Sequence, residues 1–540
     1  MASSAARPFK SFQRTRCFTA VITLLSSQVG ASIDFEAHVK APYILDRDFF
    51  GYSMALSGDT LAVGAFDDDS CATGVTTTAA TVATDNGCGG AGAVYVFTLS
   101  FPTWTLQAYV KAPAVPASDR FGDSVALSGD TLAVGAYLED SCATGVSTTP
   151  ATDDGCSSAG AVYVYTRSGT TWTFEAYVKA PAVTADDNFG DSLALSGNTL
   201  AVGAYSEDSC ATGVSTTAAT DDGCDGAGAA YVYTRSGTTW TFEAYVKAPV
   251  VSSGDSFGGS LALSGDTLAV GAYSEDSCAT GVSTTTATDD GCSSAGAVYV
   301  YTRSGTTWTF EAYVKAPVVT SGDSFSGSVA LSGDTLAVTA YGEDSCATGV
   351  STTTATDDGC DTAGAAYVYT RSGTTWTFEA YVKAPDVTAS DSFGDSLALS
   401  GNTLAVGAYG EDSCATGVST TAATDDGCSV AGAAYVYTRS GTTWTFEAYV
   451  KAPAVTSSDY FGRSVALSGD TLAVGAYFED SCATGVSTTA ATDDGCSNTG
   501  AAYGSSVVSP LDYGGRHELS GTSAAVRMRT SSKLRWGSGA

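Results

Sequence analysis

Acidic residues placed beside cysteines are the first feature of this sequence that could do chemistry. In one copy of a repeated segment, a Glu-Asp pair lies just before one cysteine and an Asp-Asp pair lies just before the next. The candidate cation ligands taken from three such copies are Glu139, Asp140, Asp153, Asp154, Glu207, Asp208, Asp221, Asp222, Glu275, Asp276, Asp289 and Asp290. Gathered carboxylates repel one another, and a divalent cation, calcium first among them, would relieve that repulsion. The alternative is that these are solvated acidic loops that keep the protein soluble.

The same carboxylates raise the question of glycoside hydrolysis. An acid-base pair needs two groups that their surroundings make different, and it usually occurs once per molecule. Here the acidic set returns seven times with hardly a change. The chain also has only two histidines, His38 and His517, one near each terminus, which argues against catalytic triads and histidine-ligated zinc. Repetition favours binding over catalysis, so we expect no enzyme and assign no catalytic residue.

Fourteen of the fifteen cysteines fall into seven regular pairs. The pairs are Cys71 with Cys88, Cys142 with Cys156, Cys210 with Cys224, Cys278 with Cys292, Cys346 with Cys360, Cys414 with Cys428 and Cys482 with Cys496. Zinc sites usually show cysteines two to four residues apart, a much closer spacing than this. An even, regular set in an exported chain predicts disulfides. The spacing leaves open whether each bridge stays within one repeat or reaches a neighbouring repeat.

The remaining cysteine, Cys17, lies in an N-terminal segment typical of a secretory signal peptide. Residues 1–31 carry four basic residues and no acid, then an apolar run over 17–25, and then small residues up to Ala31. The run is about half the ~20 residues that a membrane span needs, so a permanent anchor is the weaker interpretation. We therefore predict cleavage near Ala31, no membrane span afterwards, and a secreted or cell-surface protein.

Charge and composition narrow the class of protein further. The chain has 24 Lys and Arg against 57 Asp and Glu, a formal net charge of −33, so nucleic acid is not expected as a partner. Hydrophobic residues make up 44% and charged residues only 15%, which indicates a folded core rather than a disordered polyelectrolyte. The many Gly and Tyr residues and the scarcity of Met favour an all-β protein.

A repeat determines the predicted architecture. Seven copies open at Phe50, Phe121, Phe189, Phe257, Phe325, Phe393 and Phe461. The second copy contains four strand signals, at 124–128, 131–137, 161–166 and 172–180, with a tight Ser-Gly-Asp-Thr turn between the first two. Charged residues on the fourth strand, such as Glu175 and Lys179, suit an outer edge that must avoid pairing with other chains. Seven units of four strands predict a seven-bladed β-propeller.

The two ends of the chain fit a closed ring. Residues 35–42 form a fourth-strand signal with no preceding three, while the last copy loses the pattern after Tyr503. The N-terminal strand is therefore predicted to complete the seventh blade, with the propeller covering 33–503 and the third strand of that blade compromised. His38 takes the place of Tyr177 and is expected to be a strand residue. The basic segment 504–540 is predicted to be a flexible or out-of-frame extension, with a basic recognition arm as the alternative.

The repeats resemble the FG-GAP repeat family, the seven-bladed propeller of integrin α-subunit heads and of many secreted microbial and protist proteins. Phe-Gly opens six of the seven copies, and LAVGA followed by AGAVYVY matches the second and third strands of that family. The family's calcium loop, DxDxDG between the first and second strands, is replaced here by SGDT or SGNT, which is too short to supply six oxygens. The fifth copy has Ser326 and Thr339 where glycines are usual, so we expect it to be the least regular.

In four-stranded antiparallel blades, the long loops and the linkers between blades share one face. The resemblance to integrin heads implies that this acidic face binds the ligand. We therefore expect a monomeric, secreted binding or adhesion module that contacts an extracellular protein or glycan, with calcium as its expected cofactor if the loops hold a cation. The alternatives are a propeller hydrolase acting on surface polysaccharide and a structural extracellular coat protein.

Overall fold

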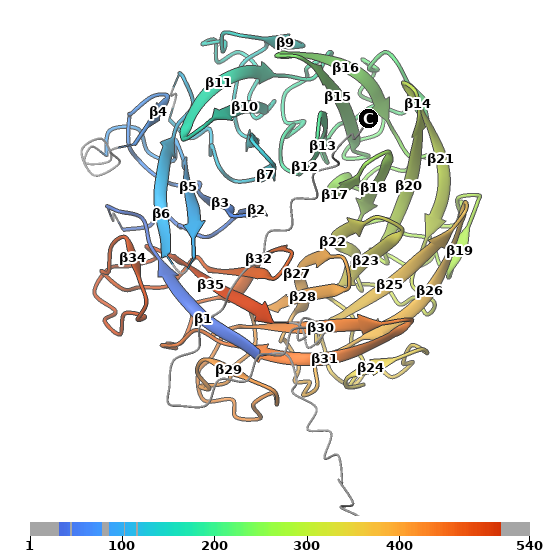
Figure 1. Ribbon diagram of the computed structural model, residues 1–540. Helices are drawn as coiled ribbons and strands as arrows, with labels where there is room; N and C mark the ends of the chain where they lie inside the picture. Colours follow the sequence, from blue (N-terminus) through green and yellow to red (C-terminus); the bar gives the residue numbers. More distant parts are fainter. Residues whose placement is uncertain (1–31, 44–45, 78–85, 102, 115–116, 509–540) are drawn as a thin grey trace, which may run out of the picture. The chain divides into compact units, whose positions relative to one another are not determined.

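The computed structural model describes residues 32–43, 46–77, 86–101, 103–114 and 117–508. The predicted signal peptide and residues 509–540 of the predicted tail lie outside the described residues. All the elements described are β-strands, in seven antiparallel sheets arranged as a ring (Figure 1). The predicted all-β, seven-bladed propeller is therefore confirmed. The described part of the chain contains no helix long and apolar enough to cross a membrane.

Blade 2 illustrates how the repeat folds. From the centre outward, its strands are β7 (Val125–Ser128), β8 (Thr131–Ala136), β10 (Ala161–Ser168), β11 (Thr171–Val178) and β9 (Val146–Ser147). Gly129, with φ of 59°, allows the tight turn between β7 and β8. Every residue of β8 is buried, because neighbouring blades cover both faces of the sheet.

The other six blades have the same strand order. Blade 1 contains β2 (Met54–Ser57), β3 (Thr60–Ala65), β5 (Ala93–Ser100), β6 (Thr103–Val110) and β4 (Val75–Thr76). Blade 3 contains β12 (Leu193–Ser196), β13 (Thr199–Ala204), β15 (Ala229–Ser236), β16 (Thr239–Val246) and β14 (Val214–Ser215). Blade 4 contains β17 (Phe257–Ser264), β18 (Thr267–Ala272), β20 (Ala297–Ser304), β21 (Thr307–Val314) and β19 (Val282–Ser283). Blade 5 contains β22 (Phe325–Ser332), β23 (Thr335–Ala340), β25 (Ala365–Ser372), β26 (Thr375–Val382) and β24 (Val350–Ser351). Blade 6 contains β27 (Phe393–Ser400), β28 (Thr403–Ala408), β30 (Ala433–Ser440), β31 (Thr443–Val450) and β29 (Val418–Ser419). Blade 7 contains β32 (Phe461–Ser468), β33 (Thr471–Ala476), β35 (Ala501–Val508), β1 (Ser32–Val39) and β34 (Val486–Ser487).

The outer edge of each blade differs from the prediction. A fifth strand of two residues, β9 in blade 2, pairs with β11, so that Val146 lies opposite Val178. The charged residues of β11 and its continuation do not guard an exposed edge: Lys179 is fully buried, and the side chain of Glu175 is 7% exposed. The prediction of a charge-protected edge was wrong, because a strand from the long loop pairs with the end of the fourth strand and its charges pair inside the protein.

The N-terminal strand closes the ring, as predicted. β1 pairs with β35 from Ser32↔Val508 to Val39↔Ala502, and its other side pairs with β34. The expectation that the third strand of blade 7 is compromised was wrong, since β35 is a full strand of eight residues. It forms because backbone bonds to β33 on one side and β1 on the other do not require the Tyr and Arg side chains of the other copies. The propeller therefore extends to Val508, five residues beyond the predicted limit.

The core lies between the blades. One buried cluster joins Val162 and Val164 of blade 2 with Phe189 and Leu200 of blade 3. Equivalent clusters join the other neighbouring blades, so each blade depends on the next to bury its apolar face. Blade 5, expected to be the least regular, still forms all five strands, and its Ser326 takes a φ of 84° where the other copies have glycine.

Candidate functional site

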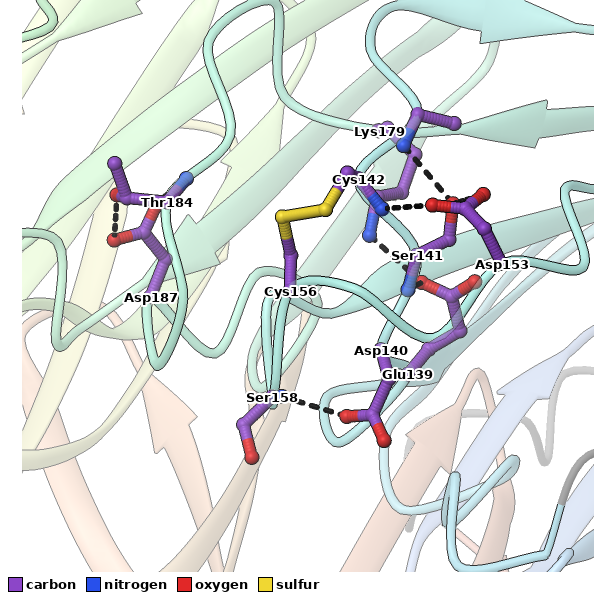
Figure 2. Close-up of a disulfide and its surroundings, with 11 residues drawn as sticks. Glu139, Asp140, Ser141, Cys142, Asp153, Cys156, Ser158, Lys179, Thr184 and Asp187 are labelled. Carbon is purple, nitrogen blue, oxygen red and sulfur yellow. Dashed lines mark hydrogen bonds and ion pairs between the residues drawn. A yellow bond between two sulfur atoms is a disulfide. The ribbon is translucent and has the colours of Figure 1, made fainter.

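Each of the seven disulfides closes a loop within its own blade. In blade 2 the bridge joins Cys142 and Cys156, whose Cα atoms are 5.1 Å apart, and β9 lies inside the closed loop (Figure 2). The bridges are Cys71–Cys88, Cys142–Cys156, Cys210–Cys224, Cys278–Cys292, Cys346–Cys360, Cys414–Cys428 and Cys482–Cys496. The question that the sequence left open is thus resolved in favour of bridges within repeats. Closing a loop of about 15 residues stabilises it by about 3 kcal/mol in the chain-entropy account.

The closed loops and the linkers between blades lie together on one face, which we call the loop face. The backbone N–H of Asp186, in the linker, donates to the carbonyl of Ser157, in the loop, at 2.7 Å. On the opposite face, the short turns contact one another, and the N–H of Gly129 donates to Ser57 Oγ of the previous blade at 3.0 Å. The predicted separation of long loops from short hairpins is therefore present.

Glu139, the first predicted cation ligand, is buried and already paired. Its Oε1 accepts a hydrogen bond from the Tyr177 hydroxyl at 2.6 Å, and its Oε2 lies 2.7 Å from Lys179 Nζ (Figure 2). Glu139 is 3% exposed. Burial lowers the pKa of Lys179, and the charge of Glu139 opposes that shift. This carboxylate therefore anchors the start of the loop to the fourth strand rather than facing a ligand.

Two further predicted ligands hold the loop by hydrogen bonds to its backbone. Asp140 accepts from the N–H of Ser158 at 2.7 Å. Asp153 accepts from the N–H of Cys142 at 2.9 Å and from Ser141 Oγ at 2.8 Å, and these bonds, the backbone bond first, lower its pKa. Figure 2 shows these contacts on either side of the disulfide. The loop is thus fixed by its own carboxylates as well as by its bridge.

The same arrangement recurs in blades 3 and 4. The buried glutamates accept bonds from the equivalent tyrosine and lysine, and the aspartates that follow them accept backbone N–H bonds; these residues are Glu207, Asp208, Glu275 and Asp276. Asp221 and Asp289 accept from the N–H of Cys210 and Cys278. The last aspartate of each set is exposed to solvent, namely Asp154, Asp222 and Asp290.

The predicted ligands do not assemble into a metal centre. Within the described residues, no group of three or more His, Cys, Asp or Glu side chains is placed to hold a metal ion. In the loops of blades 2, 3 and 4, three of the four carboxylates already accept hydrogen bonds from donors of the protein itself, as in blade 2. The residues as placed therefore do not fit a calcium site, and the short turns between the first and second strands offer no replacement.

The linker aspartate, which lies next to these carboxylates, was not among the predicted ligands. In blade 2 this residue is Asp119, which is 4% exposed and whose Oδ2 has no hydrogen-bond partner. Burial, followed by the charge of Glu139, raises its pKa to about 8. In the next linker, Thr184 donates to the equivalent Asp187 at 2.7 Å. The signal was available in the sequence, because an aspartate precedes every opening Phe by two residues.

In blade 4 the linker aspartate lines a small cavity below the disulfide loop. The cavity has a volume of about 50 Å³, and Asp255 meets Glu275, Asp276, Asp289 and Asp290 around it. Burial, then the charge of Glu275, raises the pKa of Asp255 to about 7. Because a cavity needs about 10–15 Å³ of such volume to hold one water molecule, this cavity has room for a few waters between the carboxylates.

The repeats match the model of a known protein family. The model for the FG-GAP repeat matches residues 34–97, 104–165, 172–233, 240–301, 308–369, 376–437 and 444–504. The chain belongs to the FG-GAP repeat family. Each match starts near a fourth strand and ends in the third strand of the next blade, as the ring closure requires.

Two further comparisons concern individual proteins. The curated proteins give no match to this FG-GAP propeller. Among solved structures, it is similar to the WD40 domain of Toxoplasma gondii coronin, with a TM-score of 0.40 and 10% identity over 90% of this chain and 88% of that chain.

Proposed function

We propose that this FG-GAP propeller is a non-catalytic binding or adhesion module, secreted or displayed at the cell surface. Seven disulfides support an oxidising, extracellular environment, since such bonds are rare in reducing compartments. The ligand is an extracellular protein or glycan, and a monomer suffices because all seven sheets, including the closing one, are completed within one chain.

The observation that carries this proposal is the rigidity of the loop face. In blades 2 to 7 each loop is held by a disulfide and a buried Glu–Lys pair, and in blade 1 Asp68 pairs with Lys111 instead. In blade 2 two aspartates also accept bonds from backbone N–H groups of the loop. Rigid loops lose little conformational entropy when they bind a partner, which favours recognition. The remaining exposed carboxylates, such as Asp154 and Asp222, give the face a negative charge that attracts a basic ligand.

Calcium does not carry the proposal, because the carboxylates as placed do not fit it. A thermal melt of the full oxidised protein in calcium and in EDTA, at constant ionic strength, tests this directly. A ligand that binds only the folded state raises the free energy of unfolding by RT ln(1 + [L]/Kd), and the melting temperature rises with it. We expect no calcium-specific shift, and a shift of several degrees would show that the loops rearrange around the ion.

The hydrolase alternative has less support from the site. The buried glutamates of blades 2, 3 and 4 have the same bonding partners, whereas an acid-base pair needs two groups that their surroundings make different. Release of reducing sugar from surface polysaccharide by the purified protein would establish the alternative. Retention in an insoluble cell-wall fraction would instead favour a structural coat protein.

The binding proposal is tested with charge variants of the full chain. Asp154→Asn with Asp222→Asn removes two exposed charges from the loop face. Asp59→Asn with Asp470→Asn removes two exposed charges from the hairpin face and is the matched control. We expect binding to intact cells, measured by flow cytometry with labelled protein, to fall with the first pair and not with the second. Equal loss in both variants would overturn the assignment of the face.

A further inference from the structure

Three positions in the repeat carry aromatic or arginine residues in some copies and glycine or serine in others, and all three lie at one place in the fold. The first is the residue before the opening Phe, and the second is the third residue of the copy. The third is the residue after the Tyr or Phe that directly follows the second strand, such as Tyr137. These positions end the linker, lie at or just before the start of the innermost strand, and begin the long loop. They therefore lie at the loop-face end of the two inner strands of each blade, whose labels Figure 1 shows. We call this zone the inner rim.

On one side of the inner rim, aromatic side chains of blades 7 and 1 form a single cluster, the rim patch. Its members are Phe49, Tyr52, Phe66, Tyr460, Tyr477 and Phe478. The Phe49 and Phe66 rings stack with centroids 5.1 Å apart, and Phe49 also meets Phe478 edge-on at 5.4 Å. All except Phe66, which is 8% exposed, are half-buried and keep part of their surface in solvent.

Arginines that break the repeat gather at the same patch. The described lysines are all buried, and five arginines repeat at one position over a Trp ring, namely Arg167, Arg235, Arg303, Arg371 and Arg439. The three other arginines of the described residues are Arg47, Arg120 and Arg463. Arg120 lies over the Phe66 ring at 5.0 Å, and Arg463 lies over the Tyr52 ring at 5.3 Å. Burial raises the pKa of the Asp67 carboxyl group, and the positive charges of Arg120 and Arg47 both oppose that shift.

The fold does not need these side chains. Blade 4 builds the same backbone with Ser256, Gly259 and Ser274 at the three positions, and blade 5 does so with Ser324, Gly327 and Gly342. Aromatic and arginine residues at one part of a ring that is otherwise nearly uniform therefore indicate a role other than holding the blades together. Half-exposed aromatic rings with arginine guanidinium groups are enriched where proteins bind ligands.

We propose that the rim patch is a binding site for an acidic saccharide, a pyranose ring that carries a carboxylate. This site goes beyond the proposed function, because its ligand is negative whereas the outer loops attract a positive one. The half-exposed rings of Phe49, Tyr477 and Phe478 offer apolar surface to the C–H face of a sugar, whereas Phe66 and Tyr52 carry the two arginines over their rings. A guanidinium group binds a carboxylate through two parallel hydrogen bonds. The tyrosine hydroxyls of the patch and the carboxyl of Asp67 supply partners for sugar hydroxyls.

The charges around the patch suit an anion in a chain that is otherwise strongly acidic. Arg463 forms an ion pair with Asp395 at 2.6 Å. Arg120 donates a hydrogen bond to the Tyr137 hydroxyl at 2.9 Å and, within the described residues, has no carboxylate oxygen within 4 Å of its guanidinium group. Burial raises the pKa values of the nearby Asp123 and Asp191 to about 8 and about 7, which favours the neutral form of both carboxyl groups. The patch is thus less negative than its acidic residues alone imply.

The experiment is calorimetric titration of the full oxidised protein with three probes at 150 mM salt, which screens distant charges. The probes are trigalacturonate, its methyl ester and triglutamate. We expect trigalacturonate to bind at least tenfold more tightly than either of the others. No binding, equal binding of the neutral ester, or equal binding of the acidic peptide would overturn the proposal, the last by showing that the patch recognises charge without the sugar.

Substitutions borrowed from other blades locate the binding without threatening the fold. Arg120→Ser and Phe478→Ser install the residues that blade 4 carries at the equivalent positions, Ser256 and Ser274. Each is expected to weaken trigalacturonate binding at least tenfold, and unchanged binding would overturn the site. Phe101→Gly removes a 53% exposed ring outside the rim and should leave binding unchanged.

The outcome separates the rim site from the proposed function. The variant with Asp154→Asn and Asp222→Asn should lose cell binding and keep trigalacturonate binding. If trigalacturonate fails to bind while cell binding still depends on those aspartates, the rim proposal falls and the loop-face proposal stands. If the reverse is found, the loop-face proposal falls alone.

Discussion

The five joints between blades 1 and 6 and the two joints that flank blade 7 differ in the bonds that cross them. Between blades 2 and 3, the Tyr233 hydroxyl donates to the carbonyl of Lys179 at 2.8 Å, and Trp240 Nε1 donates to Glu175 at 2.8 Å. Equivalent bonds cross the other four joints of this set. These joints are held by the same polar contacts because the copies there are nearly identical.

Among the described residues, those bonds are absent around blade 7. Phe97 and Ser505 stand where the other copies place the donating tyrosine, and the Nε1 of Trp104 is buried with no hydrogen-bond partner. Other contacts still cross these joints, among them the hydrogen bond from Ser464 Oγ to the carbonyl of Gly51, the Arg463–Asp395 ion pair and the apolar cluster around Val39. The pairing of β1 and the Lys40–Glu479 ion pair act within blade 7 itself. The ring is therefore expected to open first at blade 7, because fewer interactions must break there.

The largest expected effect comes from the buried ion pair at the closure. Lys40→Met leaves the Glu479 carboxylate buried without a cation, and breaking such a pair costs about 3–5 kcal/mol. Lys247→Met breaks the matching pair with Glu207 in blade 3 and serves as the control. We expect the first variant to lower the melting temperature more than the second and to speed hydrogen exchange in β1. Equal effects would show that the closing blade is no weaker than the others.

Low pH is the second condition expected to destabilise the closing blade. Burial lowers the pKa of His38 from 6.5 to about 4, so the neutral imidazole contributes about 3 kcal/mol above pH 6.5. That contribution is lost as the pH falls through 6.5 towards 4, because the unfolded chain then binds the proton more readily. Glu479, 3.8 Å away, and Asp493 oppose the shift, and Lys40 adds to it.

His38→Tyr places in β1 the residue that the other blades carry. The variant should lose less stability than the unchanged protein between pH 7 and pH 4, as measured by urea unfolding at each pH. Identical pH profiles for the two proteins would mean that the imidazole does not control acid opening.

Tryptophan variants compare the two kinds of joint directly. Trp240→Phe removes a hydrogen bond to a charged group, worth about 1.5–3 kcal/mol, whereas Trp104→Phe removes none. We expect the Trp240 variant to be the more destabilised by roughly that difference, which chemical denaturation would measure. A larger loss from the Trp104 variant would contradict the comparison.

The smallest expected effect is an increase in stability. Phe97→Tyr adds at the blade 7 and blade 1 joint the hydroxyl that donates to a lysine carbonyl in the five complete joints, and such a bond contributes about 1 kcal/mol. The variant should melt at a higher temperature, while Tyr233→Phe, the reverse change in blade 3, should melt lower. No gain would indicate that the carbonyl of Lys40 lies out of reach.

Much of the architecture was predictable because its signals are local. Alternation in segments such as TLAVGA, the Gly-centred turns and the cysteine spacing each act within one copy, and seven copies repeat them. The site was less predictable. Glu139 and Lys179 were assigned to a cation site and to an exposed edge, yet they pair with each other, because segments 40 residues apart meet inside one blade. Asp119 was overlooked because its importance comes from burial, which depends on the packed linker.

The sequence by itself determined the number of blades, the closure by β1 and the pairing of cysteines into seven sets, because each follows from a pattern that repeats along the chain. Only the tertiary structure decided which carboxylates remain free, that a fifth strand covers each outer edge, and that Phe49, Arg120 and Phe478 meet at one rim. Those outcomes depend on contacts between blades that closing the ring brings together.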